Sequence, residues 1–113
     1  MKKELVILAK EKQYFSFHSI NKEVGNGWYI ELCLLQKWLR EVHNIEVDVM
    51  RYTYSGGEYQ GKCYMWAIDK YNPNYNPETE DPWILETRQS QGYDFKVYEE
   101  ALEIGLQEAL KLI

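Results

Sequence analysis

Apolar residues recur at three- and four-residue spacing in two long stretches, residues 28–43 and 97–113, and this spacing predicts two amphipathic helices. A third stretch, residues 2–12, has apolar residues on one side and lysines on the other. A helix of that length is not stable alone in water, so we expect it to dock on the rest of the domain. Asn44 tolerates the left-handed conformation that ends helices, so the helix over 28–43 is predicted to stop there.

Strands are predicted between the two long helices. Apolar and acidic residues alternate from Ile45 to Val49, which is the period of a strand with one buried face. A second strand is predicted over residues 59–69 and a third over residues 83–88. Gly56-Gly57 suits a two-residue hairpin turn between the first two strands, because glycine adopts positive φ without strain.

The glycine turn fixes a register for this hairpin. It places Val47 opposite Trp66 and Val49 opposite Tyr64, with all four side chains on the face that packs against the helices. A slip of one residue would bury Glu46 instead, so the side chains themselves favour this pairing.

The predicted order is helix, helix, three strands, helix, which corresponds to a two-layer α+β domain with a three-stranded antiparallel sheet. We expect residues 1–113 to form one domain, in which the helix over 2–12 docks on a core unit at 28–113. Residues 14–27 are ambiguous, since their aromatic residues fit an extended segment but Gly25-Asn26-Gly27 interrupts it.

In this register, one face of the sheet lacks a helix cover. Acidic residues gather at one end of that face and soft apolar residues at the other. Exposed apolar patches mark contact sites, so the apolar end is a candidate surface for a protein partner or a second copy of the chain. It consists of Met50, Tyr52, Cys63 and Met65.

The segment over residues 70–83 contains three prolines and a run of acids, and is predicted to be a long loop. Its aromatic and acidic residues are a second candidate site, for a small ligand. The residues that would converge there are Tyr71, Tyr75, Glu80 and Trp83. The loop has no glycine at which a calcium loop could turn, so a solvated loop is favoured over a calcium site.

Charge argues against nucleic acid as a partner. The chain has 18 acidic and 13 basic residues, a net charge of −5, which is the wrong sign for contacting phosphates. The order of elements from residue 28 onward is similar to that of a double-stranded RNA-binding domain, but Glu99 and Glu100 stand where that family has lysines. We therefore expect a shared order of elements without a shared function.

Catalytic machinery is not apparent in the chain. His18 and His43 are far apart, and no metal-ligand spacing, phosphate loop or nucleophile motif occurs, so we expect no metal and no cofactor. His43, in the last turn of its predicted helix, is interpreted as a cation beside the negative end of the helix dipole. Cys33 and Cys63 are interpreted as buried free thiols.

Four blocks of the chain resemble a family of small uncharacterised phage and prophage proteins of gut Bacteroidales. The blocks are LAKEK at 8–12, WLREVHNI at 38–45, YEEALE at 98–103 and EALKLI at 108–113. The family commonly has threonine before the Tyr-Glu-Glu-Ala block, whereas this chain has Val97, which lacks a capping oxygen. The resemblance implies a phage or mobile-element setting and no catalytic activity.

The N-terminal apolar run is only five residues long, at 5–9, too short for a signal peptide or a membrane span, so a cytoplasmic protein is expected. The favoured function is that of a non-enzymatic accessory protein that acts by protein–protein interaction or self-association. A ligand-binding or enzymatic role for the loop over 70–83 is the alternative, and nucleic-acid binding is disfavoured.

Overall fold

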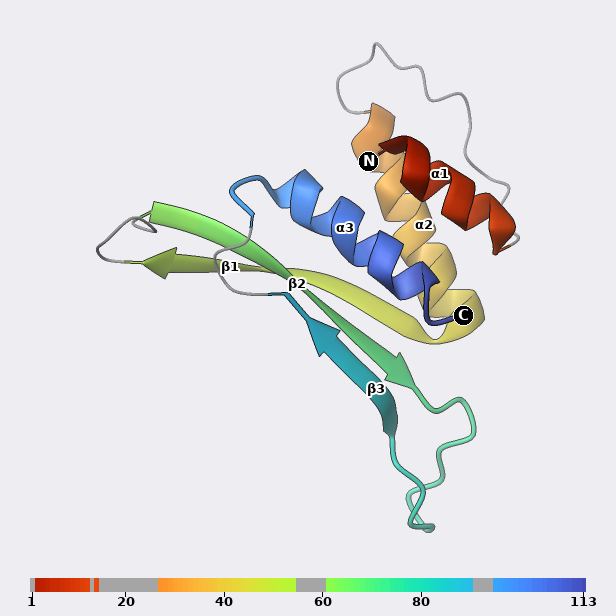
Figure 1. The fold of residues 1–113 in the computed structure, drawn as a ribbon. Helices are drawn as coiled ribbons and strands as arrows, with labels where there is room; N and C mark the ends of the chain where they lie inside the picture. Colours follow the sequence, from red (N-terminus) through yellow and green to blue (C-terminus); the bar gives the residue numbers. More distant parts are fainter. Residues whose placement is uncertain (1, 13, 15–26, 55–60, 91–94) are drawn as a thin grey trace.

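Three helices lie on one side of a three-stranded antiparallel sheet in the computed structural model (Figure 1). The structure describes residues 2–12, 14, 27–54, 61–90 and 95–113. The elements are α1 (Lys2–Glu11), α2 (Gly27–His43), β1 (Ile45–Tyr54), β2 (Gly61–Tyr71), β3 (Ile84–Gln89) and α3 (Tyr98–Leu110). This arrangement confirms the predicted α+β class and the predicted order of elements.

The predicted helix boundaries agree closely with the structure. α2 ends at His43, and Asn44 follows it with φ of 58°, the left-handed conformation expected of the residue that stops the helix. The ambiguous segment 14–27 falls outside the described residues except for Tyr14 and Gly27, and the predicted turn at Gly56-Gly57 falls outside them entirely.

The predicted hairpin register is wrong by two residues. Val47 lies opposite Ile68 rather than Trp66, and Val49 lies opposite Trp66 rather than Tyr64. Side chains alternate with a period of two, so a shift of two residues leaves each one on its predicted face. The division of the sheet into a helix-covered face and an open face therefore survives the error in register.

α3 packs closely on the helix-covered face of the sheet. A Cβ atom built on Gly105 would lie 2.8 Å from Cβ of Trp66 and 3.1 Å from Cγ1 of Val47. Real Cβ atoms do not approach one another so closely, so glycine permits this contact. Trp66 therefore points toward α3, on the inner face where the sequence placed it.

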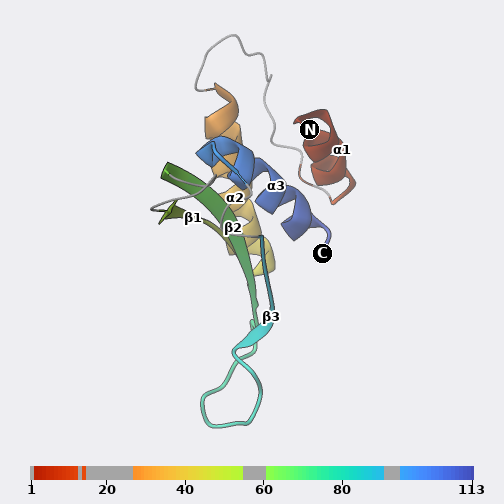
Figure 2. The same cartoon turned by 60° about the vertical axis from the view of Figure 1, so that its left-hand side comes forward.

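α1 docks against α3, on the side away from the sheet (Figure 2). Its inward-facing residues Leu5 and Ala9 are fully buried, as the apolar stripe predicted. Beyond the helix, Tyr14 is also buried, with its ring 5.0 Å from that of Trp38 in α2. Lys12 Nζ donates a hydrogen bond to the Ile113 carbonyl at 2.9 Å, which ties this region to the end of the chain.

The N-cap of α3 provides a test of local stability. Val97 occupies that position with φ −124° and ψ 132°, and its side chain makes no capping hydrogen bond. We predict that Val97→Thr raises the free energy of unfolding by about 1 kcal/mol in urea denaturation, because the hydroxyl can accept from a free N–H of the first turn. Val97→Ala is the control, and equal unfolding midpoints for the two variants would contradict the prediction.

Candidate functional site

The predicted apolar contact surface is not open as expected. Cys63 is 4% exposed and Met65 is 3% exposed, whereas Met50 is exposed as predicted and the side chain of Tyr52 is outside the described set. The expectation of exposure is therefore wrong for the two β2 residues. β2 is the central strand, and beyond the end of β3 its outer side pairs with Phe95 through Tyr64, so these residues have neighbours on both sides.

The aromatic residues predicted for the long loop do come together. Tyr71 ends β2 and Trp83 precedes β3, and their ring centroids are 5.6 Å apart. Tyr75, from the loop between them, lies 6.1 Å from Trp83. Glu80 is exposed and makes no hydrogen bond or ion pair with another described residue, so the predicted convergence includes the aromatic residues but not this acid.

Asparagine side chains organise this loop, which projects from the body of the molecule (Figure 2). The backbone N–H of Asn72 donates to the Trp83 carbonyl at 2.9 Å, and Asn72 Nδ2 donates to the Pro82 carbonyl at 3.1 Å. Asn76 Oδ1 accepts from the Glu78 N–H at 3.0 Å, an Asx turn of the kind asparagine favours. These bonds close the base of the loop and hold Trp83 beside Tyr71.

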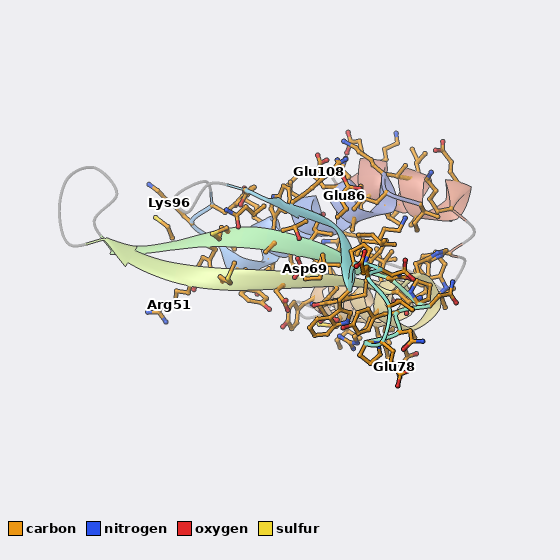
Figure 3. All side chains as sticks on the ribbon, turned by 90° about the horizontal axis from the view of Figure 1, so that it is seen from below. Arg51, Asp69, Glu78, Glu86, Lys96 and Glu108 are labelled. Carbon is orange, nitrogen blue, oxygen red and sulfur yellow. The ribbon has the colours of Figure 1, made fainter. Side chains whose placement is uncertain are left out.

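Acidic residues line the open face next to the aromatic cluster. Partial burial is the largest cause that raises the pKa of Tyr71, and the carboxylates of Asp69, Glu46 and Asp48 raise it further. Its phenol therefore remains a proton donor at neutral pH. Figure 3 shows Arg51 and Lys96 toward the opposite end of the sheet from Glu78 in the loop. The face beside the loop is therefore unsuited to phosphate contacts.

β3 is exposed along most of its length. Five of its six residues are exposed, and only Glu86 is partly covered. Trp83, just before the strand, is 59% exposed and Leu85 is 50% exposed. We call residues 83–89 the β3 edge surface. Exposed tryptophan and leucine side chains at an edge strand are typical of surfaces that a protein partner covers.

The hydrogen bonds of β3 show which backbone groups face outward. The N–H of Ser90 donates to the Trp66 carbonyl at 3.0 Å, so the backbone of residue 90 points toward β2. Backbone direction alternates along an antiparallel strand, and Ile68 pairs with Arg88 and Lys70 with Glu86. The N–H and C=O groups of Thr87 and Gln89 therefore point away from the sheet, along its outer edge.

The outer edge of β1 is covered differently. The N–H of Tyr71 donates to the Asn44 carbonyl, so the backbone groups of Asn44 point toward β2. Backbone direction alternates from residue to residue along β1, so the N–H and C=O of Val47 point outward. Gln36 Nε2, on α2, donates to the Val47 carbonyl. The helix thus satisfies part of this edge, whereas among the described residues no helix is seen along the outer edge of β3 (Figure 1).

Two carboxylates are buried in the helix layer. Glu103 of α3 is buried and accepts a hydrogen bond from Trp28 Nε1 at 3.1 Å. α3 lies between the sheet and α1 and also contacts α2, so burial extends around more of its circumference than one apolar stripe. Glu31 of α2 is also buried, and its Oε2 has no hydrogen-bond partner among the described residues.

Glu31 acts on a neighbouring phenol. Burial is the largest cause that raises the pKa of Tyr14, and the negative charge of Glu31 raises it further, so this hydroxyl stays protonated at neutral pH. Both side chains are buried, so they belong to the core rather than to a surface site.

An aromatic chain links α2, α3 and β2. Tyr98 lies 6.1 Å from Tyr29 and 5.8 Å from Tyr64 between ring centroids, with both pairs edge-on. Hydrogen bonding to the Cys33 thiol is the main cause that raises the pKa of Tyr29 to about 12. Tyr29 therefore remains protonated at neutral pH and is not a general base.

His43 binds a proton less readily than a free imidazole, so it is less suited to the role of a helix-end cation that the sequence indicated. Its ring packs edge-on against Trp38 with centroids 4.6 Å apart. Burial is the largest cause that lowers the pKa of His43 from 6.5, and the positive charge of Lys70 lowers it further. Among the described residues no group of three or more His, Cys, Asp or Glu side chains could hold a metal ion.

The lowered pKa of His43 predicts how stability depends on pH. The unfolded chain binds a proton at this position more readily than the folded chain. The stability that neutral His43 contributes to the fold is therefore present above the ordinary pKa of about 6.5 and is lost as the pH falls below it. We predict that His43→Phe, which keeps an aromatic ring beside Trp38, weakens the loss of unfolding free energy between about pH 7 and pH 5. The unfolding free energy of the wild-type chain and of His43→Phe is measured by denaturant titration at each pH. If it changes equally with pH in the two proteins, the assignment to His43 is wrong.

Comparisons of the chain with protein-family models, with curated proteins and with solved structures found no match. None of the helices in the described part of the chain has the length and apolar character needed to span a bilayer. Function is therefore inferred from the geometry of the described residues.

Proposed function

We propose that the chain is a non-enzymatic protein that acts by protein–protein association, with the β3 edge surface as its contact region. The observation that supports this function is the exposure of Trp83 and Leu85 beside a strand whose outer backbone groups face away from the sheet. An edge strand of this kind accepts another strand, and aromatic residues next to it supply contact area.

The proposal replaces the contact surface that the sequence indicated. Of the four residues predicted for that role, the two on β2 are buried, so they do not offer area to a partner. The β3 edge surface instead combines free main-chain hydrogen-bonding groups with exposed apolar side chains. Main-chain groups provide affinity and side chains provide specificity in such contacts.

The setting of this function is also a proposal. The resemblance of four sequence blocks to phage and prophage proteins supports an accessory role in a mobile element. Cys33 and Cys63 are both free thiols, which is the usual state of cysteines in a reducing cytoplasm, so we propose a cytoplasmic location. Exposed Glu99 and Glu100 at the start of α3 argue against nucleic acid as the partner.

The aromatic cluster favours a second candidate function, the binding of a small planar ligand. Tyr71 and Tyr75 each lie within stacking range of Trp83, beside the loop. We predict for this alternative that a thermal-shift panel of aromatic metabolites raises the melting temperature of the wild-type chain but not of Trp83→Ser. A panel without a single shift would remove this alternative.

The main proposal predicts that Leu85→Lys weakens association at least about tenfold, because it replaces an exposed apolar side chain of the β3 edge surface with a charge. Sedimentation velocity of the purified chain measures self-association. A pull-down with the immobilised chain measures the capture of other proteins. Ile30→Lys is the matched control, since Ile30 is an equally exposed apolar residue on α2.

We expect the control variant to associate as the wild-type chain does. The proposal fails if Leu85→Lys leaves both assays unchanged, or if the substitution on α2 has the larger effect. Circular dichroism of each variant checks that the sheet is intact before the comparison is made.

A further inference from the structure

The outward groups of β3 restrict how another strand can pair with it. Thr87 and Gln89 present their N–H and C=O groups along the outer edge, whereas Glu86 and Arg88 use theirs within the sheet. An antiparallel partner strand must therefore form its hydrogen bonds with these odd-numbered residues. Among the described residues, no helix is seen over the outer edge of β3 (Figures 1 and 2), so the approach is open.

A second copy of the chain is a partner whose edge has the same pattern. Two identical strands that pair antiparallel are related by a two-fold axis that passes between them, midway between one residue and the same residue of the other copy. Three residues near the middle of β3 can face their own copy across this axis: Glu86, Thr87 or Arg88. Each choice defines a different set of facing side chains.

Charge distinguishes among the three registers. An axis at Glu86 places two identical carboxylates opposite each other, and an axis at Arg88 places two guanidinium groups opposite each other. An axis at Thr87 places Glu86 of each copy opposite Arg88 of the other. Only this register forms two attractive cross-strand pairs and no repulsive pair.

The charged side chains are already arranged for this register. Arg88 Nη2 lies 2.8 Å from Glu86 Oε1 within one chain, on the same side of the strand. Pairing about Thr87 joins two such ion pairs into a group of four alternating charges. Networks of this kind are worth more than an isolated surface pair, which contributes little.

The same axis also pairs outward backbone groups. Thr87 of each copy forms a hydrogen-bonded pair with Thr87 of the other, and Gln89 lies opposite Leu85, the residue at which the pairing of β3 with β2 is irregular. Two sheets of three strands become one sheet of six with all helices on one face, since a two-fold axis perpendicular to the sheet preserves its faces. The helices pack mainly on β1 and β2 rather than on β3, the strand at which the two copies would meet.

We propose that the chain forms a symmetric dimer in which β3 pairs antiparallel with β3 of a second copy about Thr87. This inference rests on the proposed function and names the partner of the same surface. The contact is one strand long, so we expect a reversible dimer in the micromolar range or weaker.

The register is tested with two complementary charge variants. Glu86→Arg and Arg88→Glu each turn both attractive pairs into repulsive pairs, so each variant alone should dimerise at least about tenfold more weakly than the wild-type chain. A mixture of the two variants restores opposite charges at both positions. We therefore expect a heterodimer with the wild-type dissociation constant to within about threefold.

Sedimentation velocity with one variant fluorescently labelled measures both homodimers and the heterodimer. The double variant, with both substitutions in one chain, exchanges the two charges and should dimerise as the wild-type chain does. Lys37→Glu and Glu41→Lys serve as matched controls, because they make the same kinds of charge change at an exposed ion pair on α2. These two variants should leave dimerisation unchanged.

The outcomes separate this inference from the proposed function. A wild-type chain that stays monomeric up to about 1 mM overturns the dimer, and the proposed function survives if Leu85→Lys still abolishes capture of another protein. Single variants that dimerise normally, or a mixture that fails to recover, overturn the register about Thr87. Circular dichroism confirms that each variant is folded, so a loss of dimer is not a loss of structure.

Discussion

The fold depends on the close contact between α3 and the sheet at Gly105. The absence of a side chain there lets the helix approach until the position of a Cβ would lie 2.8 Å from Cβ of Trp66. Dispersion contacts fall steeply with distance, so this approach brings the whole inner face of α3 into contact with β1 and β2. The other side of α3 is left available to α1, and α2 contacts both α3 and β1. α3 therefore joins the sheet to α1, and the fully buried Leu102, Leu106 and Leu110 lie along it.

The position of α3 explains why Glu103 is buried although it is charged. Glu103 lies on α3 where the other helices cover it, so its carboxylate is buried and accepts a hydrogen bond from Trp28. A buried carboxylate is stabilised by such donors and is costly without them. The position of α3 also decides what remains exposed. It lies over β1 and β2, and β3 extends beyond its cover toward the projecting loop (Figure 1).

The two edges of the sheet are consequently different. Gln36 donates to the outward carbonyl of Val47 and so occupies part of the edge of β1. Exposed strand edges invite pairing, and natural proteins cover them or make them unattractive with charge. β3 carries charge, but Glu86 and Arg88 are opposite in sign and already paired at 2.8 Å within the strand. In the proposed dimer, this arrangement of charges favours one register of an identical strand over the shifted registers.

The sequence by itself determined the helices, the strands and the faces of the sheet, because these follow from local periodicity and from residues such as Asn44 with its φ of 58°. It also indicated the aromatic residues of the loop, since Tyr71 and Trp83 flank the segment whose ends must meet between paired strands. It did not determine the hairpin register, because shifts of two residues keep the same faces buried. Only the tertiary structure decided that Cys63 and Met65 are buried and that β3 is exposed, because exposure depends on which strand is central and how far a packed helix reaches.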